Sequence, residues 1–565
     1  MHLVILFSIL NAFETLKHKL TESFQRPMID VKLLKFGYFP KELPPPFNTI
    51  DLADNIQELR IKWNKKLNSL TRLEKNYYRE TNSCKYNIPK NEFIRRALQI
   101  PNPLCQIQLT QLIYSNWTEI QDKINKSKIS YSKPFNNPFS INRAVITKNN
   151  FSDFTKERLI ISADMLFEIK TDISRFYNSI YTHSIPWAIH GKRISKENRN
   201  DLSLLGNKID KLLREGNFGQ TVGIPIGPDT SLIFAEIIHS EIDNRIQSLF
   251  PKIKFLRFMD DLYAYCDNLA EAEKFIKKYQ ILLSEYQLEL NEEKTTISHK
   301  VFDFENKWTS QLSTFKFRTT NIGQASDIER FASLVFDLYR KFPNESILLY
   351  AAQILNKLNI ATQNSWKLYQ AILFKILLIE PKTIEIVTKI FIKNEKYLDK
   401  KSFKNILNKI LDENIGKNHH YEISWVLWIM KEFSFKLTKS RADLISKSED
   451  NFSILLLLDM KSKGLVSNQF NIDHIKETIN QEDLFGENWI LIYESAIKKW
   501  IEFDEDPIST NKFFTLMKDL NITFYNNSYT SRSKSNVVEE STHTFDYNLY
   551  ISNNHYDFID DTLYS

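Results

Sequence analysis

The sequence predicts an α+β region followed by an all-α C-terminal domain of helical repeats in a solenoid-like array. Strand and helix patterns alternate from about residue 160 to 310, as they do in α/β and α+β domains. After about residue 325, amphipathic helices follow one another with short polar breaks, as in SILLYAAQILNKL and WKLYQAILFKILL, which is the pattern of stacked helix pairs. The length of 565 residues exceeds what one hydrophobic core usually organises, so several domains are expected.

Composition places the chain among globular proteins, with 42% apolar and 25% charged residues. A net charge of +6 permits a nucleic-acid partner without requiring one. Cys84, Cys105 and Cys266 form no ligand pattern and no disulfide framework, which suits a reducing cytoplasm. The apolar run MHLVILFSILNAF lacks a basic leader and is too short to span a bilayer. We therefore expect a buried first helix and no membrane partner.

Before residue 160 the sequence predicts helices separated by proline-marked breaks. The first 50 residues contain a helix candidate followed by LLKFGYFPKELPPPF, whose cluster Pro44–Pro46 should break regular structure. Residues 51–80 are polar with helical spacing and predict a surface helix, whereas residues 85–150 predict short helices between proline turns. At the other end, residues 521–565 are rich in Asn, Ser, Tyr and Asp and predict a poorly ordered tail.

Two adjacent aspartates, Asp260 and Asp261, interrupt the apolar and aromatic stretch KFLRFMDDLYAYC. The residues on either side predict strands, so the pair should lie at the tip of a hairpin. Asp-Asp is a poor choice for a tight hairpin turn, and two neighbouring carboxylates repel unless a cation lies between them. Mg²⁺ prefers such oxygen ligands. The alternative is a plain turn, and the same dipeptide at Asp560–Asp561 has no flanking strands and is interpreted as solvated charge.

A third carboxylate makes the metal hypothesis specific. In MLFEIKTDISRFYNSI an apolar stretch leads into Asp172, and a helix is expected just after it. A carboxylate at the end of a strand points away from the sheet, where ligands bind. Three aspartates from two neighbouring strands can hold two Mg²⁺ ions, which activate an attacking hydroxyl and stabilise a leaving pyrophosphate.

Two further segments lie at suggestive positions. GIPIGPDTS, whose loop runs from Gly223 to Pro228, precedes an amphipathic helix for which Asp229 or Thr230 is the expected N-cap. Its glycines allow close approach of the backbone to a nucleotide. After the helix in EAEKFIKKYQILLSEYQLEL, Lys294 follows in NEEKTT and is positioned to reach a phosphate or donate a proton. The alternatives are an ordinary turn and a solvated lysine.

In this order the four segments resemble the palm of a reverse transcriptase. The resemblance implies that Asp172, Asp260 and Asp261 bind two Mg²⁺ ions and that Lys294 is the proton donor. FMDD has phenylalanine where the family's box has tyrosine. The glycine loop implies nucleotide-binding residues, which are Gly223, Pro225, Ile226 and Gly227.

The resemblance implies two more contacts to the nucleotide. Tyr177 falls where the family has the aromatic steric gate against a ribose 2′-OH, with core packing as the alternative. Arg95 and Arg96 lie where residues of the fingers hold the triphosphate, with a solvated helix face as the alternative. His183 and His190 have no cysteine partners and are expected to be structural rather than metal ligands.

Two other stretches, LLKFGYFPKELPPPF and RFYNSIYTHSIPWAIHGK, resemble the bacterial abortive-infection reverse transcriptases of the AbiK-like group. This resemblance covers about residues 30–310 and implies a polymerase core followed by a HEAT-like helical domain in place of the thumb. The implied division is an N-terminal extension at 1–84, fingers at 85–160, palm at 161–315, helical domain at 325–520 and flexible tail at 521–565.

One departure from templated reverse transcriptases concerns Ile226, which stands where they usually have glutamine and which cannot form side-chain hydrogen bonds. No primer-grip motif follows Lys294. Both agree with the abortive-infection group, which resembles template-independent polymerases that extend DNA from a protein hydroxyl and protect bacteria from phage. The implied partners are dNTPs, a covalently attached single-stranded DNA product and further copies of the chain in a homo-oligomer, all in the bacterial cytoplasm. The priming tyrosine is not identified, and Tyr38, Tyr525 and Tyr529 are candidates.

Two alternatives stay open. One is a conventional RNA-templated reverse transcriptase of the retron or group II intron type. The other is a catalytically silent scaffold whose helical domain binds a protein.

Overall fold

The computed structural model describes residues 29–90, 94–136, 143–147, 151–300, 307–318, 323–360, 362–467, 469–479 and 484–531. The expected buried first helix at the N-terminus lies outside these residues. The described chain begins with a helix over residues 29–35.

The first part of the chain is mainly helical and contains two small sheets. Its elements are α2 (Ile50–Asp54), α3 (Ile56–Asn68), α4 (Arg72–Tyr77), β1 (Cys84–Pro89), β2 (Arg95–Ile100), α5 (Pro103–Ser115), α6 (Trp117–Ile124), β3 (Pro134–Phe135), β4 (Ile146–Thr147) and α7 (Phe151–Ser162). Three helices thus replace the single helix expected over 51–80. Helix α3 is not confined to the surface, because its Leu59 and Trp63 are buried.

The hairpin β1–β2 differs from the prediction of short helices over 85–150. Its strands pair antiparallel from Cys84↔Ile100 to Pro89↔Arg95. Alternate side chains are buried on each strand, Cys84 and Tyr86 on one and Leu98 and Ile100 on the other. This alternation with a period of two is the strand signal that the flanking prolines obscured.

A four-stranded antiparallel sheet forms the centre of the next region, in the order β6-β7-β5-β8. The elements of this region are β5 (Phe167–Thr171), α8 (Phe176–Ser179), α9 (Ser184–His190), α10 (Lys192–Glu197), α11 (Leu205–Glu215), α12 (Asp229–Leu249), β6 (Lys254–Phe258), β7 (Asp261–Cys266), α13 (Leu269–Glu285), the 3₁₀ turn η1 (Glu292–Lys294) and β8 (Thr296–His299). The α+β prediction for this region is confirmed.

Strands β6 and β7 are buried on both faces, which explains their nearly continuous apolar runs. Phe255 and Leu262 face the core formed with α12 and α13. Phe258 and Tyr263 face the other side, where they pack with Phe154 of α7. The sheet therefore holds its strand ends, including the Asp260–Asp261 turn, on a rigid base.

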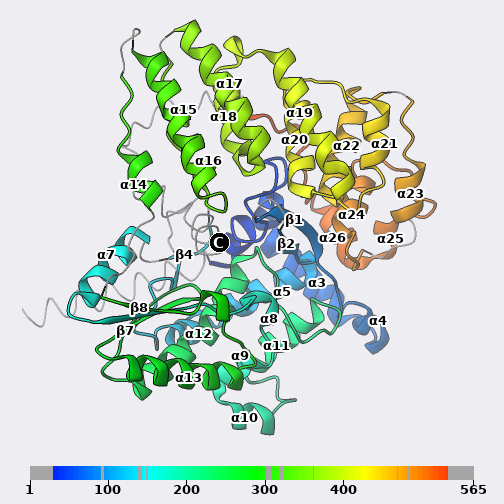
Figure 1. The fold of residues 1–565 in the computed structure, drawn as a ribbon. Coiled ribbons are helices and arrows are strands. Elements are labelled where there is room, and N and C mark those ends of the chain that lie inside the picture. The colour runs from blue at the N-terminus through cyan, green and yellow to red at the C-terminus, as the bar shows by residue number, and fades with distance from the viewer. Residues whose placement is uncertain are drawn as a thin grey trace, which may run out of the picture.

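The remainder of the described chain is almost entirely helical, as expected after residue 325. It comprises α14 (Lys307–Ser313), α15 (Gln324–Lys341), α16 (Ile347–Asn356), α17 (Gln363–Ile379), η2 (Pro381–Thr383), α18 (Ile384–Lys393), η3 (Glu395–Tyr397), α19 (Lys400–Asn414), η4 (Ile415–Lys417), α20 (His420–Glu432), α21 (Lys439–Ile445), α22 (Asn451–Ser462), α23 (Asp473–Ile479), α24 (Trp489–Ile497), α25 (Pro507–Thr510) and α26 (Lys512–Asp519). Helices two positions apart contact each other, as α15 does α17 and α16 does α18. Figure 1 shows these helices side by side in one half of the molecule and the four-stranded sheet in the other.

One hydrophobic core joins the N-terminal helices and the β1–β2 hairpin to the C-terminal helices. Tyr86 of β1 forms a 2.8 Å hydrogen bond with Ser424 of α20. The start of the predicted tail also belongs to this core: Phe524 and Tyr525 are fully buried, and Tyr525 pairs with Phe47 in an isolated bridge. The prediction of a poorly ordered tail is therefore wrong for residues 521–531, while residues 532–565 lie outside the described ones. Across the described ranges, no helix combines the length and apolar character needed to cross a membrane.

Candidate active site on the four-stranded sheet

The three aspartates lie at the same edge of the four-stranded sheet. Strands β5 and β7 are antiparallel neighbours with Thr171 opposite Leu262, so the next residues along, Asp172 and Asp261, lie opposite each other. Asp172 and Asp261 are buried, and Asp260 is half-buried in the turn between β6 and β7. The expected hairpin and the expected strand leading into Asp172 are both confirmed.

A two-residue turn presents Asp260 and Asp261. Phe258 pairs with Asp261, which leaves only Met259 and Asp260 to connect the strands. Met259 has a positive φ of 54°, a conformation that non-glycine residues adopt infrequently. The turn directs the acidic pair toward the end of β5.

Lys294 lies beside Asp172, as the position of the lysine after α13 suggested. Its Nζ is 3.2 Å from Oδ2 of Asp172, and its side chain is only 16% exposed. Asn291 donates to the same oxygen at 3.2 Å, and its backbone N–H donates to the carbonyl of Asp172 at 2.8 Å. The solvated-lysine alternative does not describe this geometry, because Lys294 is largely buried in an ion pair.

Burial and neighbouring carboxylates hold the pKa of Asp261 well above its usual range. The main cause is burial, and the negative charge of Asp260 adds to it, followed by a smaller contribution from Asp172. The positive charges of Lys170 and Lys294 act in the opposite direction. Lys170, on β5 opposite Tyr263, was not singled out from the sequence; its position two residues before Asp172 was the available signal.

The residues fit a divalent cation by charge and by donor type. Oδ1 of Asp172 is buried and has no hydrogen-bond partner among the described residues, and a cation would offset the repulsion that raises the pKa of Asp261. As the side chains lie, no three His, Cys, Asp or Glu residues in the described ranges form a group that could hold a metal ion. Release of Asp172 from Lys294 and rotation of the carboxylates would be needed to complete the ligand set.

The glycine loop between α11 and α12 is held close to the N-terminal region. Gly223 and Gly227 have φ values of 87° and 128°, which L side chains rarely adopt. The carbonyl of Ile226 accepts a 2.9 Å hydrogen bond from the N–H of Gln99 in β2. The side chain of Ile226 is half-buried against the core that includes the β1–β2 hairpin, and Pro225 beside it is also half-buried.

The expected N-cap of α12 is wrong. Pro228 occupies the N-cap position, and no side chain caps the helix there. Asp229 is instead fully buried, where its carboxylate pairs with Arg143 and accepts the N–H groups of Ala144 and Val145 at 3.0 and 3.1 Å. This carboxylate therefore joins the loop to residues 143–145.

Tyr177 lies in α8, five residues after Asp172, and is half-buried. Its ring contacts Phe176 edge to face at 5.6 Å, and its backbone carbonyl accepts the N–H of Ile224 at 3.0 Å. The structure thus brings Tyr177 and the glycine loop together. Both the steric-gate role and the packing role of the ring are compatible with this position.

Arg95 is engaged away from a nucleotide in this conformation. Its guanidinium forms two hydrogen bonds of 2.6 Å with the carboxylate of Glu422 in α20, and it also binds Asn87. Arg95 lies on strand β2, so the alternative of a solvated helix face is wrong. Neighbouring Arg96 lines a pocket of about 160 Å³ between the hairpin and the C-terminal helices, with Lys41, Lys90, Lys382 and Lys389 among its other residues. None of the three aspartates lines that pocket.

His183 and His190 have structural partners, as expected. Nδ1 of His183 is 2.9 Å from the carboxylate of Asp210, and Nε2 of His190 accepts the N–H of Gly206 at 3.0 Å. The two histidines thus join α9 to α11.

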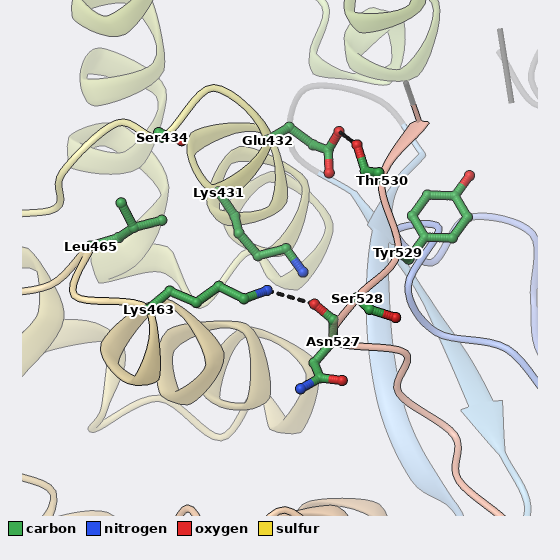
Figure 2. Close-up of a pocket in the computed structure, with 9 residues that line it drawn as sticks. All are labelled: Lys431, Glu432, Ser434, Lys463, Leu465, Asn527, Ser528, Tyr529 and Thr530. Carbon is green, nitrogen blue, oxygen red and sulfur yellow. Dashed lines mark hydrogen bonds between the residues drawn. The ribbon is translucent and has the colours of Figure 1, made fainter. Parts of the chain in front are cut away.

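Two of the candidate priming tyrosines are buried. The hydroxyl of Tyr38 donates to the carbonyl of Pro101 at 2.5 Å, and that of Tyr525 donates to Asp459 at 2.6 Å. Tyr529 is half-buried and lines a pocket of about 460 Å³ over α20 and α22, where Lys463 donates to the carbonyl of Asn527 (Figure 2). Tyr38 and Tyr525 would have to leave the core before they could act as nucleophiles.

Comparison with known proteins agrees with this geometry. Residues 143–322 match the family described as reverse transcriptase (RNA-dependent DNA polymerase). The matched segment includes all three aspartates, the glycine loop and Lys294. The chain therefore carries a reverse-transcriptase domain, and the coarse prediction of this domain is confirmed.

Matches to solved structures are distant. Apo telomerase from Candida tropicalis is similar at 16% identity and a TM-score of 0.30, over 62% of this chain and 66% of that chain. Telomerase from Candida albicans in complex with a fragment of telomeric RNA is similar at 14% identity and a TM-score of 0.25, over 64% of this chain and 63% of that chain. The alignments thus span less than two thirds of either telomerase chain. No curated protein matches the sequence.

Proposed function

We propose that this chain, which carries a reverse-transcriptase domain, is a DNA polymerase that joins dNTPs without a template and starts from a tyrosine hydroxyl of the protein. The proposal includes a role in bacterial antiphage defence of the abortive-infection type, in the cytoplasm and as a homo-oligomer. The single observation that carries the polymerase activity is the convergence of Asp172, Asp260 and Asp261 at one sheet edge beside Lys294.

Each residue has a role in the proposed reaction. Asp172, Asp260 and Asp261 would hold two Mg²⁺ ions, which supply a lowered pKa for the attacking hydroxyl and charge stabilisation for the leaving pyrophosphate. Lys294, once released from Asp172, would protonate the pyrophosphate. Tyr177 and the loop at Gly223 would confine the sugar, because their backbones are joined through the hydrogen bond from Ile224 to Tyr177.

One feature supports synthesis without a template. Ile226 packs its side chain against the core and has no polar atom with which to orient a base pair. The C-terminal helices pack directly on the β1–β2 hairpin through Tyr86 and Arg95. We further propose that these helices, whose second neighbours are in contact, form a HEAT-like solenoid in place of a thumb.

The proposal is tested by incubating the purified full-length protein with labelled dNTPs and Mg²⁺, with no nucleic acid added, followed by denaturing electrophoresis. We expect label that migrates with the protein, and mass spectrometry of the labelled peptide to identify the tyrosine. The double substitution Asp260→Ala with Asp261→Ala should abolish labelling. The matched control is Asp267→Ala, which removes an exposed aspartate just after β7 and should leave labelling unchanged.

The alternatives predict other results. A conventional reverse transcriptase would give free products whose sequence follows an added RNA. A silent scaffold would give no incorporation, and phage resistance would survive the double substitution. Either outcome would replace the proposed function.

A further inference from the structure

The turn that presents the aspartates is held from both sides by side chains. The N–H of Met259 donates to Oγ of Ser132 at 2.8 Å, and the carbonyl of Met259 accepts from Nη1 of Arg257 at 2.7 Å. Both backbone polar groups of the residue with positive φ are therefore fixed, one by the segment after α6 and one by strand β6.

Arg257 is itself fully buried and held by α12. Its Nε donates to Asp243 at 2.9 and 3.1 Å, and its Nη1 and Nη2 donate to Glu236 at 3.1 and 2.7 Å. These contacts with Asp243 and Glu236 use both edges of the guanidinium. The remaining hydrogen bond of Arg257 goes from Nη1 to the carbonyl of Met259. The orientation of the turn is thus linked to helix α12.

Three serines connect the segment 127–132 to the same network. Ser127 donates to Asp243 and Ser130 donates to Glu236, each at 2.6 Å, whereas Ser132 contacts the turn. The backbone of this segment also pairs with Arg257, through hydrogen bonds of 2.9 Å from its N–H to Ile129 and 2.8 Å to its carbonyl from Tyr131. Ser132 is fully buried, and the pairing of its segment with strand β6 fixes its position beside the turn.

Stability alone does not explain this buried network of charges, because apolar residues of similar volume often stabilise a protein as well as a buried ion pair does. What apolar residues cannot supply is a directed donor to Met259. We propose that Ser132 and Arg257 are positioning residues, which hold the Met259 turn so that Asp260 and Asp261 are presented in the geometry that metal binding and catalysis require. This inference rests on the proposed function.

A purely structural role would predict a different pattern. Loss of a buried hydroxyl would then lower stability without a selective effect on the metal requirement. A positioning role predicts that turnover falls and that more Mg²⁺ is needed, while dNTP KM and the melting temperature change little, since displacement of catalytic groups by about 1 Å costs about 100-fold in rate.

The decisive variant is Ser132→Ala, measured for kcat, dNTP KM and the Mg²⁺ concentration at half-maximal rate. The matched control is Ser240→Ala: Ser240 is also fully buried, but its hydroxyl donates at 2.8 Å to the carbonyl of Ile124, away from the turn. We expect Ser132→Ala to lower kcat and raise the Mg²⁺ requirement by about 10-fold or more, with Ser240→Ala within about twofold of wild type. Ser132→Thr, which keeps the hydroxyl, should restore most of the rate.

Equal kinetics for Ser132→Ala and Ser240→Ala would overturn the inference. If Ser132→Ala does not fold, Met259→Val decides, because a β-branched side chain disfavours positive φ at this half-buried turn; the same selective loss supports the inference, and wild-type kinetics refute it. An inactive wild-type protein would instead count against the proposed function, so the two failures are distinguishable.

Discussion

Arg95 offers a sharp test of which contacts hold nucleotide and which hold the fold. The carboxylate of Glu422 is 2% exposed and receives two 2.6 Å hydrogen bonds from Arg95, which is 19% exposed. Removing one partner of a buried pair usually costs about 3–5 kcal/mol. In Glu422→Gln the guanidinium keeps its contacts with Asn87, so we expect a cost of about 2 kcal/mol. Arg95→Met removes those contacts as well and leaves the carboxylate of Glu422 buried and unpaired, so we expect it to cost about 3–5 kcal/mol.

The assay is amide hydrogen exchange in peptides that cover residues 84–100, because it reports local opening of the β1–β2 hairpin rather than global unfolding. A loss of about 2 kcal/mol corresponds to about 30-fold faster exchange. The matched control is Lys85→Met. Lys85 lies in the same hairpin, and the substitution removes its ion pair with Glu487. That pair is exposed (56% and 42%) and should contribute less than about 1 kcal/mol.

Unchanged hairpin exchange in Arg95→Met, together with a many-fold higher dNTP KM, would contradict a structural role for Arg95. Arg95 would then be a triphosphate ligand that exchanges its partner when nucleotide binds. Faster amide exchange in the hairpin with unchanged dNTP KM would show that Arg95 stabilises the contact between the hairpin and α20.

The remaining predictions concern pH, sugar selection and priming. Burial raises the pKa of Glu494 to about 7, so the native state binds an extra proton. The free energy of unfolding therefore falls as pH rises from about 4.5 to about 7, by up to about 3 kcal/mol. The melting temperature of Glu494→Gln should equal that of wild type at pH 5 and exceed it at pH 8, and equal melting temperatures at pH 8 would contradict this. Tyr177→Ala should increase rNTP incorporation relative to dNTP by about 10-fold or more if the ring excludes the 2′-OH, and unchanged discrimination would favour simple packing. Tyr38→Phe and Tyr525→Phe should both retain covalent labelling, since these hydroxyls are buried; loss of label in either folded variant would identify it as the primer.

Local pattern was sufficient to predict the strands that carry the three aspartates. Strands with buried side chains on both faces have clear apolar runs in the sequence. The carboxylates interrupt or end these runs, so the sequence could place together Asp172, Asp260 and Asp261. Lys294 followed from its position just after a long amphipathic helix. These are contacts between neighbouring elements, for which order along the chain is a good guide.

Local sequence patterns could not predict contacts between residues that are far apart in the chain. Nothing in EFIRRALQIP indicates that Arg95 pairs with Glu422, 327 residues later in the chain. The polar composition of residues 521–531 similarly concealed two aromatic residues that complete the core, Phe524 and Tyr525. Ser132 and Arg257 were also missed, because their significance depends on where three separate segments meet.

Binding of the catalytic cations by the three aspartates can be observed by anomalous diffraction from crystals of the protein with Mn²⁺ and a non-hydrolysable dNTP. We expect two Mn²⁺ peaks, each in direct contact with carboxylate oxygens of Asp172 and the Asp260–Asp261 pair, with Lys294 moved away from Asp172. Mn²⁺ bound elsewhere, or nucleotide bound while the Lys294–Asp172 ion pair stays intact and no metal is present, would contradict it.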